Sequence, residues 1–192
     1  MKYPFPSNMI SEKLAMVVAV GWLAAAAPMV SHAQPSCQIY PIALSAQTIA
    51  GATNGQVLVD IYNGTNPGNF GWLSWTGDPS EPTLVTSLLP PGNSASYANP
   101  YNANDHQLQV GSWVWGKPGV SNGVNVRDAL DALEDIDIVV PVWDTAQGQG
   151  SQALYHVSSF ALLRIKGYRL PNQNRITAVF LGTANCGNSP PT

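Results

Sequence analysis

Charged residues are scarce in this chain of 192 residues, at 10 %, and basic residues are the scarcer kind, with eight Lys and Arg against eleven Asp and Glu. A protein that grips nucleic acid or anionic lipid needs a basic face. The composition therefore excludes both as expected partners. A surface built from Asn, Ser, Thr, Gln and Gly in place of charge is typical of exported proteins.

The sequence also lacks the motifs of common catalytic sites. It has no Walker loop, dinucleotide fingerprint, GxSxG elbow or HExxH metal motif. His106 and His156 stand far apart, and a general base oriented by Asp144 or Asp105 is one interpretation of them, while a hydrogen-bonded strand residue is the simpler one for His156. Carboxylate pairs for glycoside hydrolysis can be drawn from Asp60, Asp78, Glu81 and Asp144. We expect no cofactor and favour a protein without enzymatic activity.

Long apolar runs are represented by one segment, Leu14–Val30, whose 17 residues are rich in alanine and interrupted by Pro28. This length is short for a membrane span. With lysines in the leader and Ser31-His32-Ala33 after the run, residues 1–33 are typical of a secretory signal peptide. We therefore predict a single domain over residues 34–192, with no membrane span after cleavage.

Cysteine occurs only twice, at Cys37 and Cys186, which bracket nearly the whole of that domain. In an exported chain such a pair predicts one disulfide that ties the chain ends together. The expected location is extracytoplasmic: the periplasm, the envelope, the cell surface or the medium.

The fold expected from residue patterns is mainly β with some helix. Segments rich in β-branched and aromatic residues predict strands at 37–44, 56–62, 108–115, 136–143, 155–168 and 175–182. A first helix is predicted to begin at Ser80 and to stop before Pro90-Pro91, and a second to be capped by Asn125. We expect an antiparallel sandwich or partly closed barrel that carries two short helices.

Acidic residues cluster at the end of the second predicted helix. Asp131, Glu134 and Asp135, with Asp137 beyond them, are candidate calcium ligands because hard cations need several converging oxygens. The loop spacing of a calcium motif is absent, so we favour a solvated helix face in which Arg127 pairs with Asp131.

Two pairs of tryptophans are candidate ligand contacts: Trp72 with Trp75, and Trp113 with Trp115. Exposed tryptophan rings on a β surface can stack on sugars. Residues two apart on a strand share one face, which core packing also requires. Burial in the core is the favoured interpretation, and carbohydrate binding is the alternative.

Several short blocks in consistent order resemble the C-terminal extracytoplasmic region of TadG-type proteins of tight-adherence (Flp) pilus assembly. The resemblance spans about residues 66–182, and its blocks are NPGNFGWL at 66–73, VGSWV at 110–114, PG at 118–119, VRDALD at 126–131, VVPVWD at 139–144, and YHV with FA at 155–161. It implies an envelope or surface domain and no catalytic residues. TadG-type proteins have a retained transmembrane helix and a longer intervening region, and we expect this chain to differ from them in both respects.

Three function classes follow. The leading expectation is a non-enzymatic secreted or cell-surface module, pilus-associated or adhesive, whose partner is a protein or glycan at the cell surface. A carbohydrate-binding module is the second, and a secreted hydrolase is the third.

Overall fold

The computed structural model describes residues 37–59, 61, 69–170 and 175–186, all within the unit Pro35–Thr192. The predicted signal peptide and cleavage site lie outside these residues. Seven strands and two α-helices occur in the described part: β1 Leu44–Ser45, β2 Val57–Leu58, β3 Asn69–Ser74, α1 Glu81–Leu88, β4 Trp113–Pro118, α2 Val124–Asp131, β5 Asp137–Gln147, β6 Leu154–Tyr168 and β7 Ile176–Ala184.

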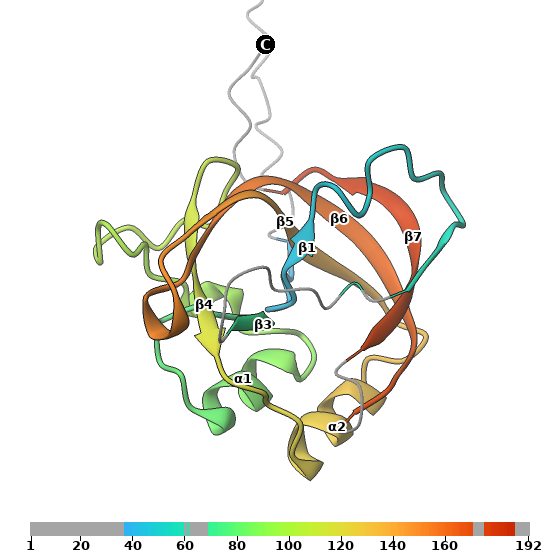
Figure 1. The fold of residues 1–192 in the computed structure, drawn as a ribbon, viewed down its shortest axis with the longest axis horizontal. Coiled ribbons are helices and arrows are strands. Elements are labelled where there is room, and N and C mark those ends of the chain that lie inside the picture. Colours follow the sequence, from blue (N-terminus) through green and yellow to red (C-terminus); the bar gives the residue numbers. More distant parts are fainter. Residues whose placement is uncertain (1–36, 60, 62–68, 171–174, 187–192) are drawn as a thin grey trace, which may run out of the picture. The chain divides into compact units, whose positions relative to one another are not determined.

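Strand β6 is the central strand of one sheet, and this sheet curls into an open half-barrel (Figure 1). Along one side β5 pairs with it antiparallel, from Gln147 opposite Leu154 to Asp137 opposite Arg164. On the other side β4 pairs with the first residues of β6, and β7 pairs with the remainder. Because β4 and β7 both pair with the same edge of β6, one after the other, the sheet divides into two parts on this side. One part continues from β4 to β3, and the other continues from β7 to β2.

The segment around β1 joins the two ends of the curled sheet. Its strand residues pair in parallel with β5, and the Tyr40 amide donates to the Val139 carbonyl at 2.8 Å. On its other side the Ala43 amide donates to Gly71 of β3 at 2.8 Å, and Ile42 forms a bridge with Trp72. The predicted mainly β fold, a partly closed barrel with two short helices, is confirmed. The strand predicted over 37–44 is instead a line of isolated bridges that leads into β1.

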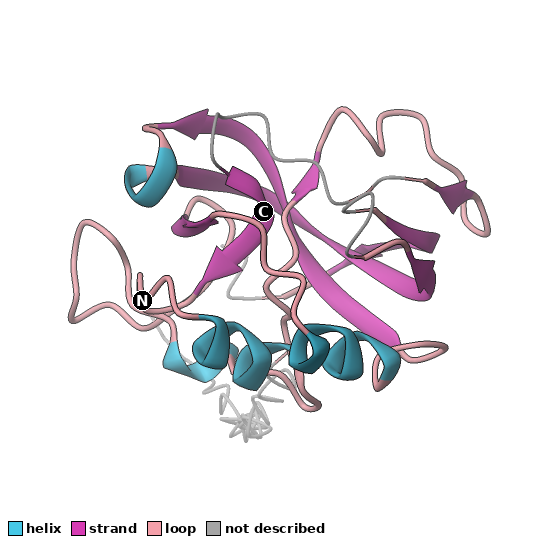
Figure 2. Cartoon of the chain, turned by 60° about the horizontal axis from the view of Figure 1, so that its bottom comes forward, coloured by secondary structure: helices cyan, strands magenta, loops and turns pink. Residues whose placement is uncertain are grey.

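The two helices lie together beneath the sheet (Figure 2). α1 begins as predicted, because the Ser80 hydroxyl accepts a hydrogen bond from the Thr83 amide at 3.3 Å. For α2 the predicted cap is wrong: the helix starts at Val124 after Gly123, and Asn125 lies inside its first turn. A Cβ atom at position 123 would meet the Glu81 carboxylate, so a larger residue there would displace the flexible end of this side chain.

Two groups of buried side chains form the core. The larger group lies between the sheet and the helices and contains the predicted apolar stripe of α2, with Leu130 fully buried. The second group surrounds Trp75, Tyr97 and Phe160 and reaches the disulfide at Cys186. The predicted Cys37–Cys186 bridge is present, with the two Cα atoms 5.5 Å apart. Within the described residues, no helix is long and apolar enough to cross a bilayer.

Candidate functional site

A cluster of accessible aromatic and polar side chains lies where β4, β5 and β6 run side by side. Its members are Trp113 from β4, Asp144 and Gln147 from β5, His156 from β6, and Tyr101 from the loop that precedes β4. We call these five residues the aromatic–histidine patch. They combine apolar ring surface with hydrogen-bonding groups, which is the mixture that ligand sites use.

The strand register brings the rings of the patch together. Trp113 stands directly opposite His156, which in turn stands opposite Thr145 of β5. The indole and imidazole centroids are 5.2 Å apart and the ring planes are tilted by 52°. The neighbouring residues Val114 and Tyr155 point the other way and are buried, so this pairing displays Trp113 and His156 on the outer face of the sheet.

A β-bulge places the carboxylate of the patch. The β5–β6 register shifts between Val142 and Trp143 and again between Trp143 and Thr145, so Asp144 has no cross-strand partner of its own. Its Oδ1 lies 2.7 Å from Nδ1 of His156. This hydrogen bond holds the pKa of Asp144 below its usual range, so the carboxylate is ionised and Nδ1 carries the proton. The Nε2 atom has no hydrogen-bond partner among the described residues and is the ring nitrogen left for a ligand.

Tyr101 stands at the tip of a loop that is rigidified by its own hydrogen bonds. The Asn99 side chain accepts from the Tyr101 amide at 3.0 Å and donates to the Asp105 carboxylate at 2.9 Å. The Tyr101 ring meets the indole of Trp113 edge to face, with centroids 6.1 Å apart and planes at 87°. The Gln147 amide donates to the tyrosine hydroxyl. Although 63 % of Tyr101 is exposed, its orientation is therefore fixed.

The four tryptophans that are candidate ligand contacts divide into two kinds. Trp72 and Trp75 are fully buried, so neither ring offers a stacking face at the surface of this structure. Trp113 and Trp115 are both half-buried on the outer face of β4. A Cβ atom at Gly77 would lie 3.2 Å from the Trp115 ring, so the loop at Gly77 covers part of this side chain. Trp113 alone of the four belongs to the patch.

His106 and its predicted partner Asp105 do not form a comparable pair. Nδ1 of His106 lies 2.7 Å from the carbonyl oxygen of Tyr97. Asp105 instead accepts hydrogen bonds from Asn99 and from the Gln107 amide, which lower its pKa. The Tyr97 hydroxyl donates to the Trp113 carbonyl at 2.8 Å, and burial raises its pKa to about 12. Through these hydrogen bonds, His106 and Tyr97 connect the loop that carries Tyr101 to the start of β4.

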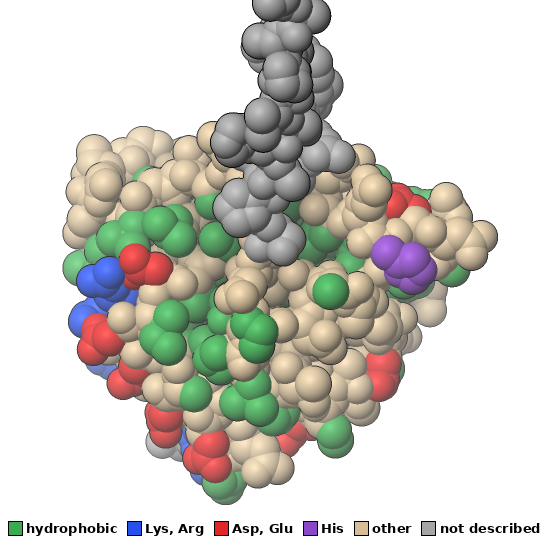
Figure 3. All heavy atoms as spheres, turned by 180° about the vertical axis from the view of Figure 1, so that it is seen from behind, with side chains coloured by type: hydrophobic (Ala, Val, Ile, Leu, Met, Phe, Trp, Pro, Cys, Tyr) green, Lys and Arg blue, Asp and Glu red, His purple; other side chains and the backbone are tan. Residues whose placement is uncertain are grey.

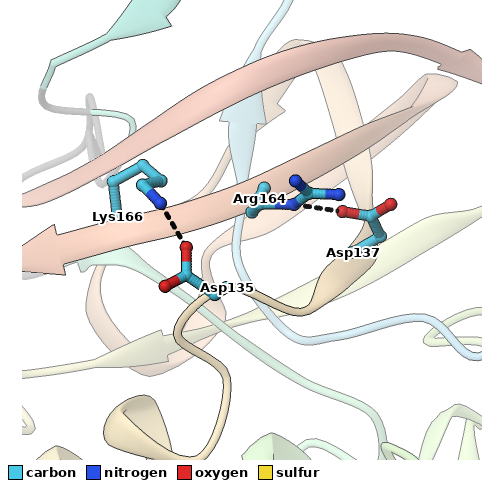
Figure 4. A network of polar contacts seen from close by, with 4 residues as sticks. All are labelled: Asp135, Asp137, Arg164 and Lys166. Atoms are coloured by element: carbon cyan, nitrogen blue, oxygen red, sulfur yellow. Dashed lines mark hydrogen bonds and ion pairs between the residues drawn. The ribbon is translucent and has the colours of Figure 1, made fainter.

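The acidic residues at the end of α2 take part in separate contacts. Asp131 accepts a hydrogen bond from Tyr168, and Asp135 forms an ion pair with Lys166 (Figure 4). The expected Arg127–Asp131 pair is replaced: Arg127 donates to the Asn122 carbonyl at 2.6 Å. Among the described residues, no group of three or more His, Cys, Asp or Glu side chains converges as metal ligands.

The other candidate carboxylates lie on different elements. Asp78 accepts from Ser80 and Thr83 at the start of α1, which lowers its pKa, and Glu81 is the first residue of that helix. Asp60 lies outside the described residues. Asp144 is thus the member of this set that the structure places in the patch.

A cavity of about 410 Å³ lies elsewhere, beside the disulfide. Its lining residues include Cys37, Ile39, Pro91 and Leu108, together with three glutamines. The cavity shares no lining residue with the patch.

Comparison of the chain with protein-family models, with curated proteins and with solved structures finds no match. The function is therefore argued from the geometry of the patch.

Proposed function

We propose that this chain is a non-enzymatic, extracytoplasmic binding module that recognises carbohydrate through the aromatic–histidine patch. The observation that carries the proposal is the display of two rings, Tyr101 and Trp113, beside the polar side chains of Asp144, Gln147 and His156. Sugars present apolar C–H faces and polar hydroxyl edges, and this patch offers a surface for each.

The geometry favours binding over hydrolysis. The His156–Asp144 pair has the form of a base and its orienting carboxylate, but a hydrolase that works through a covalent intermediate also needs a side-chain nucleophile within hydrogen-bond reach. Among the described residues, no hydroxyl contacts Nε2 of His156, and the nearby Ser158 donates to the Val142 carbonyl instead. The imidazole rests against Trp113, where it serves to hold a hydrogen-bonding edge beside the ring.

Two further features support a place outside the cytoplasm. The Cys37–Cys186 disulfide is the kind of bond that persists in oxidising compartments. The leader sequence and the resemblance to TadG-type proteins point to export and to an envelope or surface setting. An adhesive role at the surface agrees with glycan binding, and a part in Flp pilus assembly is a separate proposal that rests on the resemblance alone.

The experiment is glycan-array binding of the purified oxidised domain, followed by titration of each hit in solution. Trp113→Ala should weaken binding by about 30-fold, because a central tryptophan at a binding surface commonly contributes about 2 kcal/mol. Val124→Ala is the control at an exposed apolar position on another element. Val124 is 60 % exposed, close to the 63 % of Tyr101 in the patch, but it lies on α2.

A second pair of variants addresses the hydrolase alternative. His156→Ala and His106→Ala are compared in the same array and in a screen of ester, peptide and glycoside substrates, after each is shown to be folded. Weaker glycan binding for His156→Ala alone supports the proposal. A hydrolytic activity that His156→Ala abolishes, or glycan binding that Trp113→Ala leaves unchanged, refutes it.

A further inference from the structure

We infer that the patch accepts a single neutral sugar residue at the end of a glycan chain, and not the flat face of a long polymer. The inference rests on the proposed function and specifies its ligand. It follows from the angles between the rings, from the charges around them and from the position of the polar groups.

The rings of the patch form a corner. Tyr101 stands at 87° to Trp113, and the imidazole of His156 is tilted by 52° to the same indole. A module that adsorbs to a crystalline polysaccharide needs coplanar rings, so that several sugar units lie flat at once. Here the Tyr101 ring stands almost perpendicular to the indole, and we call it the wall of the corner. A sugar that stacks on Trp113 meets this wall at one edge, and a chain cannot continue through it.

Two hydrogen bonds hold Tyr101 in place. Gln147 donates to the Tyr101 hydroxyl, and Asn99 fixes the Tyr101 backbone. Since both contacts come from side chains of the protein itself, they preform the corner, and little ordering is needed on binding. A preformed corner discriminates by shape between a terminal and an internal sugar unit.

The polar groups of the patch can bond the hydroxyl groups of a sugar. Asp144 supplies carboxylate oxygens, which only accept hydrogen bonds when ionised, and His156 presents Nε2 on the side of its ring away from this carboxylate. Ligand hydroxyls can donate to the carboxylate and to Nε2 of the neutral imidazole. A hydrogen bond to the Asp144 carboxylate is charge-assisted and about twice as strong as a neutral one, so the site favours ligands with adjacent free hydroxyls, as a terminal unit has.

The charges near the patch exclude acidic sugars. Lys117 is buried, bonded to Ser121 at 2.5 Å, and Arg164 and Lys166 form ion pairs at the other end of β6 (Figure 4). At 3.3 Å per residue, Arg164 stands about 26 Å along the strand from His156. The remaining basic residues after position 33 lie on α2 and at the turn between β6 and β7: Arg127, Arg169 and Arg175.

Seen from behind, the visible Lys and Arg side chains gather along one side of the molecule, whereas acidic side chains are spread over both sides (Figure 3). A uronate or sialate at the patch would meet the Asp144 carboxylate with no cation to balance it. A neutral hexose or N-acetylhexosamine meets no such repulsion.

The experiment compares three sets of probes on the oxidised wild-type domain: neutral oligosaccharides of one to six units from the best array hit, microcrystalline cellulose and chitin, and sialyl- or uronate-terminated versions of the hit. We expect the affinity for a single unit and for six units to agree within about threefold, and the acidic versions to bind at least tenfold more weakly. Retention on the crystalline polymers should equal that of Trp113→Ala.

Tyr101→Ala tests the wall directly. This variant should bind the single unit about tenfold more weakly and should gain affinity with each added unit, since the chain can then extend across Trp113; Val124→Ala should behave as wild type. Affinity of the wild type that rises steadily with chain length, tight retention on crystals, or a preference for acidic sugars would each overturn the inference while leaving glycan binding in place. A folded wild type that binds no glycan would overturn the proposed function as well.

Discussion

Removing the disulfide should lower the free energy of unfolding by an amount that depends on the length of the loop that the disulfide closes. Cys37 and Cys186 are separated by 149 residues. In the chain-entropy model, a closed loop of about 150 residues restricts the unfolded state by about 5 kcal/mol at 25 °C. Cys186 also packs in the second core group, so Cys37→Ala with Cys186→Ala loses a small amount of contact as well. The expected loss is up to about 5 kcal/mol.

The assay is urea unfolding of the oxidised wild type and the double variant, followed by tryptophan fluorescence. Without the bond the unfolded chain expands, so the slope of the free energy against urea should also rise in the variant. At about 2 to 4 °C per kcal/mol for a domain of this size, the melting temperature should fall by roughly 10 to 20 °C.

Wild type reduced with dithiothreitol and kept reduced is the control, because it retains both sulfur atoms and lacks only the bond. It should match the double variant within about 1 kcal/mol, the size of a small packing change in a core. If the oxidised wild type and the double variant unfold at the same urea concentration with equal slopes, the bond does not restrain the unfolded chain and the reasoning fails.

Three further predictions concern the core, the patch and the export signal. Leu130→Ala, at a fully buried position of α2, should cost about 2 to 5 kcal/mol in urea unfolding, whereas Val124→Ala on the same helix should cost under about 0.5 kcal/mol; equal losses would contradict the packing. Because the folded-state pKa of Asp144 lies below its unfolded value, its stabilising contribution is present above about pH 4 and is lost as the pH falls through the folded value. Wild type should therefore lose more stability than Asp144→Asn between pH 5 and pH 3, and parallel curves would contradict this. The exported protein should begin at or next to Gln34, and an intact mass that includes residues 1–33 would refute the cleavage.

The fold was predictable where a segment carries its own pattern. Leu130 belongs to a stripe with helical period, and Ser80 is a good helix cap, so α1 and the buried face of α2 follow from local rules. Gly123 was missed because the side chain it lies against, Glu81, belongs to another helix. The strand β3 was missed as an element because its six residues have mixed character and its pairing with β4 is set at a distance.

The site was less predictable, because register and bulges assemble it. The spacing of Trp113 and Trp115 shows that they share a face of a strand but not which face is covered. The pairing of Asp144 with His156 was one of several possibilities in the sequence, and a bulge in β5 selected it. Tyr101 carries no signal of its own: it lies in a long polar loop, and its neighbours Trp113 and Gln147 come from distant strands.

The position of the first strand sets the order in which the domain can assemble. Residues 39–46 lie between β3 and β5 and form hydrogen bonds with both. Leu44 in this segment pairs with Val142, which is synthesised nearly a hundred residues later. Contacts between such distant positions form slowly. Before these contacts form, the edges of β3 and β5 have no strand paired with them on this side. Anything that restrains the beginning of the domain, such as an uncleaved leader held by export machinery, should therefore postpone closure. We expect a variant that lacks residues 34–46 to remain protease-sensitive at β3 and β5 while the β6–β7 pairing persists, which limited proteolysis with mass spectrometry would show.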